Sequence, residues 1–246
     1  MRAALFHTPA PPVPRRAAGC TLWWAPLDAA RPGHAALLTP HERARAERFA
    51  RGEDRTRSLL NAALLRLAVP AETGTPAAAV DVVRRCGTCA GPHGRPTLPG
   101  TGLSVSLSHA GRRVVVALSR DGDVGVDVER RTGLDAAALA GALAPQEAAG
   151  DPLRLWVRKE AVLKATGEGL TVEPREVVVA RGDGVAAPVA HPLRPGLVAA
   201  VRDLAPDDDH VAAVALLGAG FGPGAGSGSG VGVLVVREHD AAPLLG

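Results

Sequence analysis

The stretch "WVRKEAVLKATGEGL", residues 156–170, holds both lysines of a chain that elsewhere meets its need for positive charge with arginine. It closes a segment predicted to be helical, and Gly167 is typical of the glycine that follows the last turn of a helix. On such a helix Trp156, Glu160 and Lys164 are spaced i, i+4, i+8 and line one stripe. An indole, a carboxylate and an amine therefore share one face.

Short β runs separated by Gly, Pro and Arg turns lie on both sides of this helix. Those before it are "CTLWWAPLD" (20–28), "VDVVRR" (80–85), "LSVSLSHA" (103–110), "RVVVALS" (113–119) and "VGVDVE" (124–129), and those after it are "REVVVAR" (175–181), "GLVAAVRDL" (196–204) and "HVAAVALL" (210–217). After the first run, Thr39, Pro40 and Glu42 form a capping-box signature that opens one short and one long helix. The order of elements predicts an α+β (α/β) fold of two similar halves.

This order divides the chain into four segments. They are a flexible N-terminal arm (1–20), an N-terminal α/β subdomain (21–120), a C-terminal α/β subdomain with the acids of the candidate metal site (121–217) and a Gly-rich flexible tail (218–246). A faint repeat supports two halves, because "NAALLRLA" (61–68) aligns without gaps with "KEAVLKAT" (159–166), although any two amphipathic helices look alike. In the tail, "VGVLVVREHD" (231–240) fits either an extra edge strand or an untethered end.

Composition and charge narrow the class of protein. The 246 residues suffice for one large or two small domains, and 46% of them are apolar. The net charge of +3 permits an anionic partner, but there is no basic run with interleaved aromatics of the kind that binds nucleic acid. We find no signal-peptide run or membrane span, and three cysteines fit a reducing compartment. We therefore expect a cytoplasmic protein without a nucleic-acid or membrane partner.

Two acids in "VGVDVERR" suit a divalent cation. In a β run Asp127 and Glu129 project from the same face, while Val126 and Val128 point into the core. Neighbouring carboxylates repel unless they share a cation, and Mg²⁺ takes one or two carboxylates and completes its shell with waters and substrate phosphates. The alternative is an exposed strand end that carries ordinary solvated charge.

Further residues add to this candidate site. On the helix, Glu160 offers a third acid, and Lys164 offers a compact charge for a phosphate, although a helical Glu–Lys pair is the commoner reason for such spacing. Ser108 and His109 end a β run before Gly111, where an imidazole can meet a phosphate. The chain has no Gly-x-Ser-x-Gly elbow, P-loop or dinucleotide fingerprint.

The motifs "SLSHAG", "GVDVE" and "WVRKEAVLKATGEGL", in this order, resemble the 4′-phosphopantetheinyl transferase superfamily, specifically its long, Sfp-type members with two subdomains. The resemblance runs from about Leu38 to Leu217. It implies two similar α/β halves related by a pseudo-twofold axis, with coenzyme A and Mg²⁺ at their junction. It also implies transfer of phosphopantetheine from coenzyme A to a serine of an acyl or peptidyl carrier protein, as in a holo-[acyl-carrier-protein] synthase, which leaves adenosine 3′,5′-bisphosphate.

The resemblance also assigns roles to residues. It implies that the metal ligands are Asp127, Glu129 and Glu160, and that Glu147 in "LAPQE" is the acid of a catalytic motif. It implies that Lys164 neutralises the transferred phosphate and that Ser108 and His109 contact the pyrophosphate. It also implies that Arg57 holds the 3′-phosphate with Arg45 as a second basic contact, and that Arg95 in "GRP" is a further phosphate or adenine-side contact. The base that deprotonates the serine is left open among Glu160, Glu147 and a metal-bound water.

Departures from the family pattern concern carrier and phosphate binding. Leu143 and Ala144 replace the usual aromatic pair before Glu147, which leaves the carrier preference open among fatty-acid, polyketide and nonribosomal-peptide pathways. Glu42 stands where some relatives carry a basic residue, which would weaken the grip on the 3′-phosphate. "CGTCAGPH" (86–93) offers too few ligands for a structural zinc site, and we expect a tight turn with reduced thiols.

The expected partners are coenzyme A and an acidic carrier protein. An arginine-rich surface would steer such a carrier, unless it is only a solvated helix face; it comprises Arg43, Arg45, Arg48, Arg51 and Arg55. Both halves of the site lie in one chain, so a monomer is expected. Two other functions stay open: a Mg²⁺-dependent hydrolase of coenzyme A-like pyrophosphates, and a non-catalytic module that binds carrier proteins.

Overall fold

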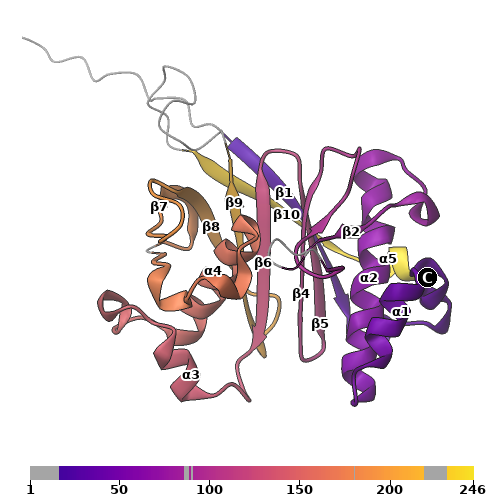
Figure 1. The fold of residues 1–246 in the computed structure, drawn as a ribbon, viewed down its shortest axis with the longest axis horizontal. Coiled ribbons are helices and arrows are strands. Elements are labelled where there is room, and N and C mark those ends of the chain that lie inside the picture. Colours follow the sequence, from indigo (N-terminus) through magenta and orange to yellow (C-terminus); the bar gives the residue numbers. More distant parts are fainter. Residues whose placement is uncertain (1–16, 86–88, 90, 180, 219–231) are drawn as a thin grey trace, which may run out of the picture.

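The computed structural model describes residues 17–85, 89, 91–179, 181–218 and 232–246 of the chain (Figure 1). Eight strands form one sheet in the order β4-β5-β1-β10-β7-β8-β9-β6. They are β1 (Ala17–Pro26), β4 (Ser104–Ala110), β5 (Arg113–Ser119), β6 (Asp123–Arg130), β7 (Asp183–Pro188), β8 (Val198–Leu204), β9 (His210–Leu217) and β10 (Val233–Asp240); β2 (Val83–Arg84) and β3 (Pro96–Thr97) form a separate small sheet. The helices are α1 (Pro40–Glu47), α2 (Gly52–Thr73), α3 (Ala136–Gly141), α4 (Pro152–Thr166) and α5 (Ala242–Leu245).

The two halves of the chain share one topology. The first half runs β1–α2–β4–β5 and the second runs β6–α4–β8–β9, with the long helix after the first strand in each. In both halves the third strand lies between the other two and pairs antiparallel with each of them. The prediction of two similar α/β halves is therefore confirmed, and the aligned segments 61–68 and 159–166 lie on the corresponding helices.

Each long helix covers one part of the sheet, and the strands enclose a third cluster between them. In Figure 1, α2 lies on one side of the molecule and α4 on the other. On β5, Val114 and Val116 pack under α2, whereas Val115 and Ala117 face the interior. The side chains of β9 alternate in the same way, with one set packed under α4 and the other facing the interior. These layers follow from the period of two in the strand sequences. Among the described residues, no helix is long and apolar enough to cross a membrane.

A glycine sets the distance between α4 and β6. A Cβ added at Gly125 would lie 1.9 Å from the carbonyl oxygen of Ala161 and 2.5 Å from the backbone nitrogen of Ala165. No side chain fits into this space, so only glycine lets the helix backbone approach the strand so closely. The contact places the turn of α4 that includes Lys164 directly over β6.

The two ends of the sheet, β4 and β6, lie side by side without a backbone ladder between them (Figure 1). Serine hydroxyls of β4 replace the missing carbonyl acceptors. Three backbone N–H groups of β6 donate to these hydroxyls: that of Val124 to Ser104 at 2.9 Å, that of Val126 to Ser106 at 3.1 Å and that of Val128 to Ser108 at 3.3 Å. The alternating serines of "SVSLS" fix the register between the two halves.

Both ends of the chain differ from the sequence-based prediction. β1 begins at Ala17, so residues 17–20 belong to the sheet and not to an arm. The tail prediction is wrong for residues 233–245: β10 pairs with β1 along its whole length and lies between β1 and β7, and Leu234 is fully buried. The edge of β1 needs a partner, and β10, whose first half is apolar, supplies it. Residues 1–16 and 219–231 lie outside the described residues.

Two predicted elements are shorter than expected. The run "REVVVAR" (175–181) begins with a 3-10 turn at Pro174–Glu176, and its described residues, which exclude 180, make only an isolated bridge between Val178 and Ala190. The segment predicted as helical before residue 167 is divided into α3, a 3-10 turn at Pro145–Glu147 and α4. Proline starts both 3-10 turns, because it lacks the N–H that a continuing helix would need.

Candidate active site

Asp127, Lys164 and Ser108 meet where β6, α4 and β4 come together. The Nζ of Lys164 lies 2.6 Å from Oδ1 of Asp127, and it also donates to Oγ of Ser108 at 3.0 Å and to the carbonyl of Val126 at 3.1 Å. The Ser108 hydroxyl donates to the same Asp127 oxygen at 2.9 Å. Asp127 is only 4% exposed. The sequence-predicted lysine, aspartate and serine therefore form one hydrogen-bonded cluster, which joins both halves of the chain.

Glu129 and Glu160 add negative charge beside this cluster. Burial, together with the charge of Asp127, raises the pKa of Glu129 to about 7. Burial and the charge of Asp127 also raise the pKa of Glu160. The charge of Asp127 acts on both glutamates, so the three carboxylates predicted as metal ligands are close enough to repel each other. The single positive charge of Lys164 does not balance all three.

The donor set fits a divalent cation. The second carboxylate oxygen of Asp127, Oδ2, is buried and has no hydrogen-bond partner among the described residues. An orphaned carboxylate oxygen in a negatively charged site is what a cation would satisfy. Across the described residues, the acids do not already converge as a closed three-ligand cluster. This arrangement suits Mg²⁺, which needs only one or two carboxylates and takes waters and phosphates as its other ligands.

Arg57, His109 and Glu129 line one cavity of about 300 Å³ next to the acids. The Nε of Arg57 donates to the carbonyl of Gly111 at 2.7 Å, and the guanidinium forms ion pairs with Glu53 and Asp54. Partial removal from water, and then the charges of Lys164 and Arg57, lower the pKa of His109. A neutral imidazole results at neutral pH, with one nitrogen free to donate and one to accept.

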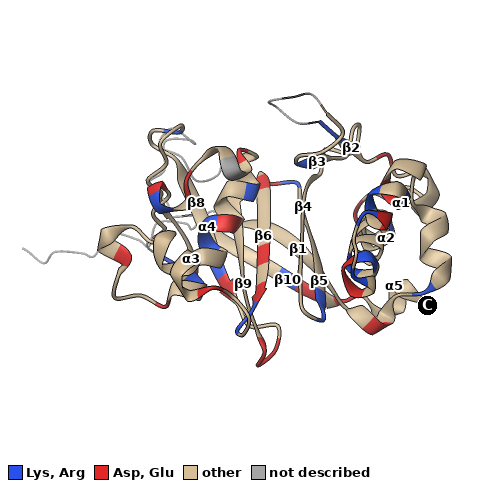
Figure 2. Cartoon of the chain, turned by 60° about the horizontal axis from the view of Figure 1, so that its bottom comes forward, with Lys and Arg blue, Asp and Glu red and all other residues tan. Residues whose placement is uncertain are grey.

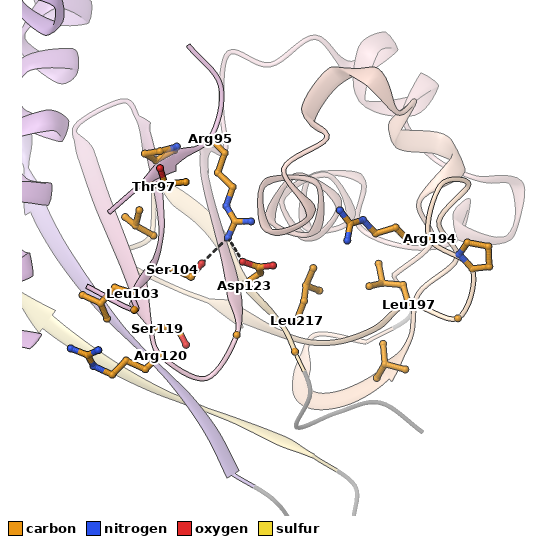
Figure 3. A pocket seen from close by; sticks show the side chains of 18 residues that line it. Arg95, Thr97, Leu103, Ser104, Ser119, Arg120, Asp123, Arg194, Leu197 and Leu217 are labelled. Atoms are coloured by element: carbon orange, nitrogen blue, oxygen red, sulfur yellow. Dashed lines mark hydrogen bonds and ion pairs between the residues drawn. The ribbon is translucent and has the colours of Figure 1, made fainter. Parts of the chain in front are cut away.

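Arg95 does not lie with these residues. Its guanidinium donates to the carbonyl of Ala165 at 2.8 Å, to Oγ of Ser104 at 2.7 Å and to the Asp123 carboxylate at 2.8 Å (Figure 3). It lines a separate, larger cavity of about 760 Å³ at the N-terminal ends of β4 and β6. Four residues of strand, or roughly 13 Å, separate Ser104 from Ser108. Its assignment to a phosphate stays a prediction, and the structure gives Arg95 the role of linking β4, β6 and the end of α4.

Glu147 also lies apart from the cluster. Its Oε2 is 2.6 Å from Nζ of Lys159 and accepts a hydrogen bond from the backbone of Ala144 at 2.9 Å. Lys159 is fully buried and donates as well to the carbonyl of Pro174 at 3.0 Å. The structure therefore places Glu147 in a buried ion pair that fixes the loop before α4, and not beside the acids of β6. The sequence analysis missed this pairing, because the two residues are twelve positions apart in different elements.

Arg45 is exposed on α1 and does not line the cavity of Arg57 and His109, and its assignment to a phosphate stays a prediction. Burial, and then the charge of Arg45, lower the pKa of Arg84 to about 10, so these two arginines are neighbours. Glu42, expected to weaken phosphate binding, instead caps α1 with Thr39 and forms an ion pair of 2.9 Å with buried Arg66. Its charge is thereby balanced within the protein.

The cysteine segment is only partly described. Cys86 lies outside the described residues, and the Sγ of Cys89 is 3.0 Å from Nε2 of His93. A tight turn with reduced thiols stays a prediction.

Comparisons with known proteins agree with the fold and with the motifs at this site. Residues 23–121 match the family described as "4'-phosphopantetheinyl transferase, N-terminal", and residues 123–215 match the "4'-phosphopantetheinyl transferase superfamily". The chain belongs to the 4′-phosphopantetheinyl transferase superfamily. Among its relatives, "4'-phosphopantetheinyl transferase HetI" of Nostoc sp. is 30% identical over 223 residues, which cover 81% of this chain and 88% of the relative. "Putative 4'-phosphopantetheinyl transferase slr0495" of Synechocystis sp. is 30% identical over 176 residues, which cover 64% and 68%.

The buried pair of Lys159 and Glu147 makes a prediction about stability. Lys159→Met leaves a buried carboxylate without its counter-charge, and we expect it to lower the free energy of unfolding by about 3 to 5 kcal/mol. The double variant Lys159→Met/Glu147→Leu should recover more than half of this loss, because a neutral apolar pair needs no counter-charge. Urea unfolding measures both, with exposed Arg175→Met as the control. A double variant as unstable as the single one would contradict the pairing.

Glu129 makes a prediction about pH. Its pKa is about 7 in the folded protein against 4.5 in the reference state, so between these values the folded protein holds a proton that the unfolded chain has lost. Stability should therefore fall as the pH rises through this range. We expect Glu129→Gln to match the wild type near about pH 5 and to exceed its stability by about 1 to 2 kcal/mol near about pH 8.

Urea unfolding in the presence of EDTA checks this expectation. The exposed residue Glu176 provides the control Glu176→Gln, which should follow the wild type at both pH values. Parallel curves for the wild type and Glu129→Gln would show that the Glu129 carboxyl is not perturbed.

Proposed function

We propose that this protein transfers the 4′-phosphopantetheine group of coenzyme A to a serine of an acyl or peptidyl carrier protein, in a Mg²⁺-dependent reaction that leaves adenosine 3′,5′-bisphosphate. The single observation that carries the proposal is the cluster of Lys164, Asp127 and Ser108 with one orphaned carboxylate oxygen. Membership of the superfamily supports the same reaction. Residues of both halves meet in one chain, so we propose that it acts as a monomer.

The acids of the site would hold the cation. We assign Oδ2 of Asp127 as its first protein ligand, and Glu129 and Glu160, which lie beside it without forming a three-ligand cluster in the described residues, as the acids that would turn onto the cation when it binds. When bound, Mg²⁺ would neutralise charge on the pyrophosphate oxygens of coenzyme A. The ligands come from β6 and α4, so the close packing of these two elements fixes their separation.

Basic residues would hold the phosphates. Lys164 lies beside the acids and would carry positive charge to the phosphate being transferred. His109, as a neutral imidazole, would donate a hydrogen bond to the pyrophosphate, and Arg57 in the same cavity would bind the 3′-phosphate. Arg57 is presently paired with Glu53 and Asp54, so the phosphate would compete with these exposed and half-buried carboxylates.

The carrier serine must lose a proton as its oxygen attacks. Its Oγ forms a bond to the phosphorus that bears pantetheine, and the bond from that phosphorus to the bridging oxygen breaks. The bisphosphate leaves with the electron pair, and the serine proton passes to a base. We assign Glu160 as this base, because Glu147 is already bound to Lys159; as a ligand of the cation, Glu160 would take the proton on the carboxylate oxygen that the cation leaves free.

Intact mass of a purified apo carrier protein, incubated with this protein, coenzyme A and Mg²⁺, tests the proposal. We expect the carrier to gain one phosphopantetheine, and EDTA to prevent the gain. Asp127→Asn should lower the rate by at least about 100-fold, because it removes a charged ligand from the cation site. Exposed Asp208→Asn is the control and should keep the wild-type rate.

The other outcomes would contradict the proposal. Cleavage of coenzyme A without any modified carrier would favour a hydrolase. Binding of carrier without either reaction would favour a non-catalytic module. A near-normal rate in Asp127→Asn would exclude the proposed metal site.

We further propose that the arginine surface on α1 and the start of α2 steers the carrier. Figure 2 shows arginines and acidic residues mixed along these helices. Of the five arginines on this surface, Arg43 donates to the carbonyls of Ala35 and Leu38. The other four are exposed and have no ion pair among the described residues; they are Arg45, Arg48, Arg51 and Arg55. Arg57 follows on the same helix and lines the cavity, so a carrier bound there would lie next to the site.

Charge reversal tests this surface. Arg51→Glu should raise KM for an acidic carrier by about 3- to 10-fold at low salt and leave KM for coenzyme A unchanged. The effect should shrink as salt screens the charges. Arg175→Glu makes the same change of charge on the other half and is the control. An equal effect of the two variants would assign the steering to net charge rather than to this surface.

A further inference from the structure

The turn between β4 and β5 positions two residues of the proposed coenzyme A site. It begins after Ala110, the neighbour of His109 and the last residue of β4, and its Gly111 has a φ of 49°. The carbonyl of Gly111 accepts the hydrogen bond from Nε of Arg57. The position of this turn therefore sets the position of both the imidazole and the guanidinium.

His210, the first residue of β9, holds this turn from the other half of the chain. Its ring is buried, with 4% exposed, and its Nε2 lies 3.2 Å from the carbonyl oxygen of Ala110. A carbonyl oxygen only accepts, so Nε2 is the donor. Its Nδ1 lies 2.7 Å from Oδ1 of Asp207. The imidazole thus bridges a carboxylate of one half and the backbone of the other.

Asp207 is itself held in place. Nε of Arg113, on β5, donates to its Oδ2 at 2.5 Å. Its partial burial acts in the opposite direction, but the bonds from Arg113 and His210 lower the pKa of Asp207 to about 2. The carboxylate is therefore ionised and accepts from Arg113. Since the Ala110 carbonyl and this carboxylate both only accept, His210 makes both of its bonds when each ring nitrogen carries a proton. A chain of contacts from Arg113 through Asp207 and His210 to Ala110 closes around the turn.

Packing leaves the turn no room to shift toward β9. A Cβ added at Gly111 would come within 2.8 Å of Nε2 of His210 and within 2.5 Å of Cδ of Arg130. The imidazole therefore lies directly against the turn. Arg130 belongs to β6 and pairs with His210 in the sheet, so the same contact fixes the position of the turn relative to the strand that carries Asp127 and Glu129.

We propose that His210 is a positioning residue, which uses its bond to the Ala110 carbonyl to hold His109 and Arg57 in the place where they meet the phosphates of coenzyme A. This inference rests on the proposed function. His210 lines neither the small cavity nor the acidic cluster, so it acts through the turn and not on the substrate. The bond to Asp207 orients the ring, and the bond to Ala110 carries the effect to the site.

Two substitutions separate the bonds. In His210→Gln the amide nitrogen takes the place of Nε2 and can still donate to the carbonyl of Ala110. In His210→Asn the side chain is too short to reach this carbonyl, and only the hydrogen bond to Asp207 remains. We expect His210→Asn to raise KM for coenzyme A by about 5- to 10-fold, the effect of one lost hydrogen bond, with little change in kcat. His210→Gln should stay within about 2-fold of the wild type, and KM for the carrier should not change in either variant.

The buried residue His34 supplies a matched control. Its Nε2 contacts the carbonyl of Leu245 at 3.1 Å and its Nδ1 accepts from the backbone of Arg31, so it is not part of the chain of contacts from Arg113 to Ala110. His34→Asn should lower the unfolding midpoint without a change in KM for coenzyme A. Should His210→Asn not fold, Asp207→Asn tests the same chain of contacts at a half-buried position and should give a smaller rise in KM.

Coenzyme A binding by calorimetry and unfolding midpoints complete the experiment. Equal rises in KM for the Gln and Asn variants, in step with equal losses of stability, would overturn the positioning role and leave a structural one. Unchanged coenzyme A binding in both variants, with a wild type that binds and transfers, would overturn this inference alone. A wild type that neither binds coenzyme A nor modifies a carrier would instead overturn the proposed function, and the inference with it.

Discussion

The close approach of α4 to β6 at Gly125 is the contact on which the site depends. It brings the backbone of the helix against the strand two residues before Asp127. Any side chain at this position would push the helix outward and separate Lys164 from Asp127, whose atoms now lie 2.6 Å apart. Glu160, one turn earlier on α4, would move with it. One missing Cβ therefore determines how a helix of one motif meets a strand of another.

Three of the links between the two halves differ in their chemistry. Serine hydroxyls connect β4 with β6, the terminal strand β10 connects β1 with β7, and the ring of His210 connects the β8–β9 turn with the β4–β5 turn. Side-chain bonds are used on the side of the site, and a backbone ladder is used on the opposite side. A backbone ladder between β4 and β6 would use N–H groups that now bind serines, and would leave Ser108 without its place between Asp127 and Lys164. The serine seam thus both joins the halves and builds the site.

Local patterns predicted the elements well, because they depend on nearby residues. The capping box of α1, the helix ending at Gly167 and the shared face of Asp127 and Glu129 all follow from spacing. The place of β10 did not follow, since its sequence VLVVREHD after a Gly-rich segment has no period of two that would select one partner edge. Nor did the roles of Arg95 and Glu147, because motif position does not reveal which internal partners a charged side chain finds.

The chemistry of the two lysines explains their retention in an arginine-rich chain. A guanidinium is a planar fork that binds both oxygens of a carboxylate, whereas an ammonium is a point charge. At Asp127 the ammonium of Lys164 takes Oδ1 alone and leaves Oδ2 without a partner, so the carboxylate can be neutralised by the lysine and still bind a cation. An arginine there would occupy both oxygens and remove the first ligand of the proposed Mg²⁺ site. Lys159 meets a different constraint, because its fully enclosed ammonium has one oxygen of Glu147 and the carbonyl of Pro174 as partners, and these two acceptors would not satisfy the five N–H groups of a guanidinium.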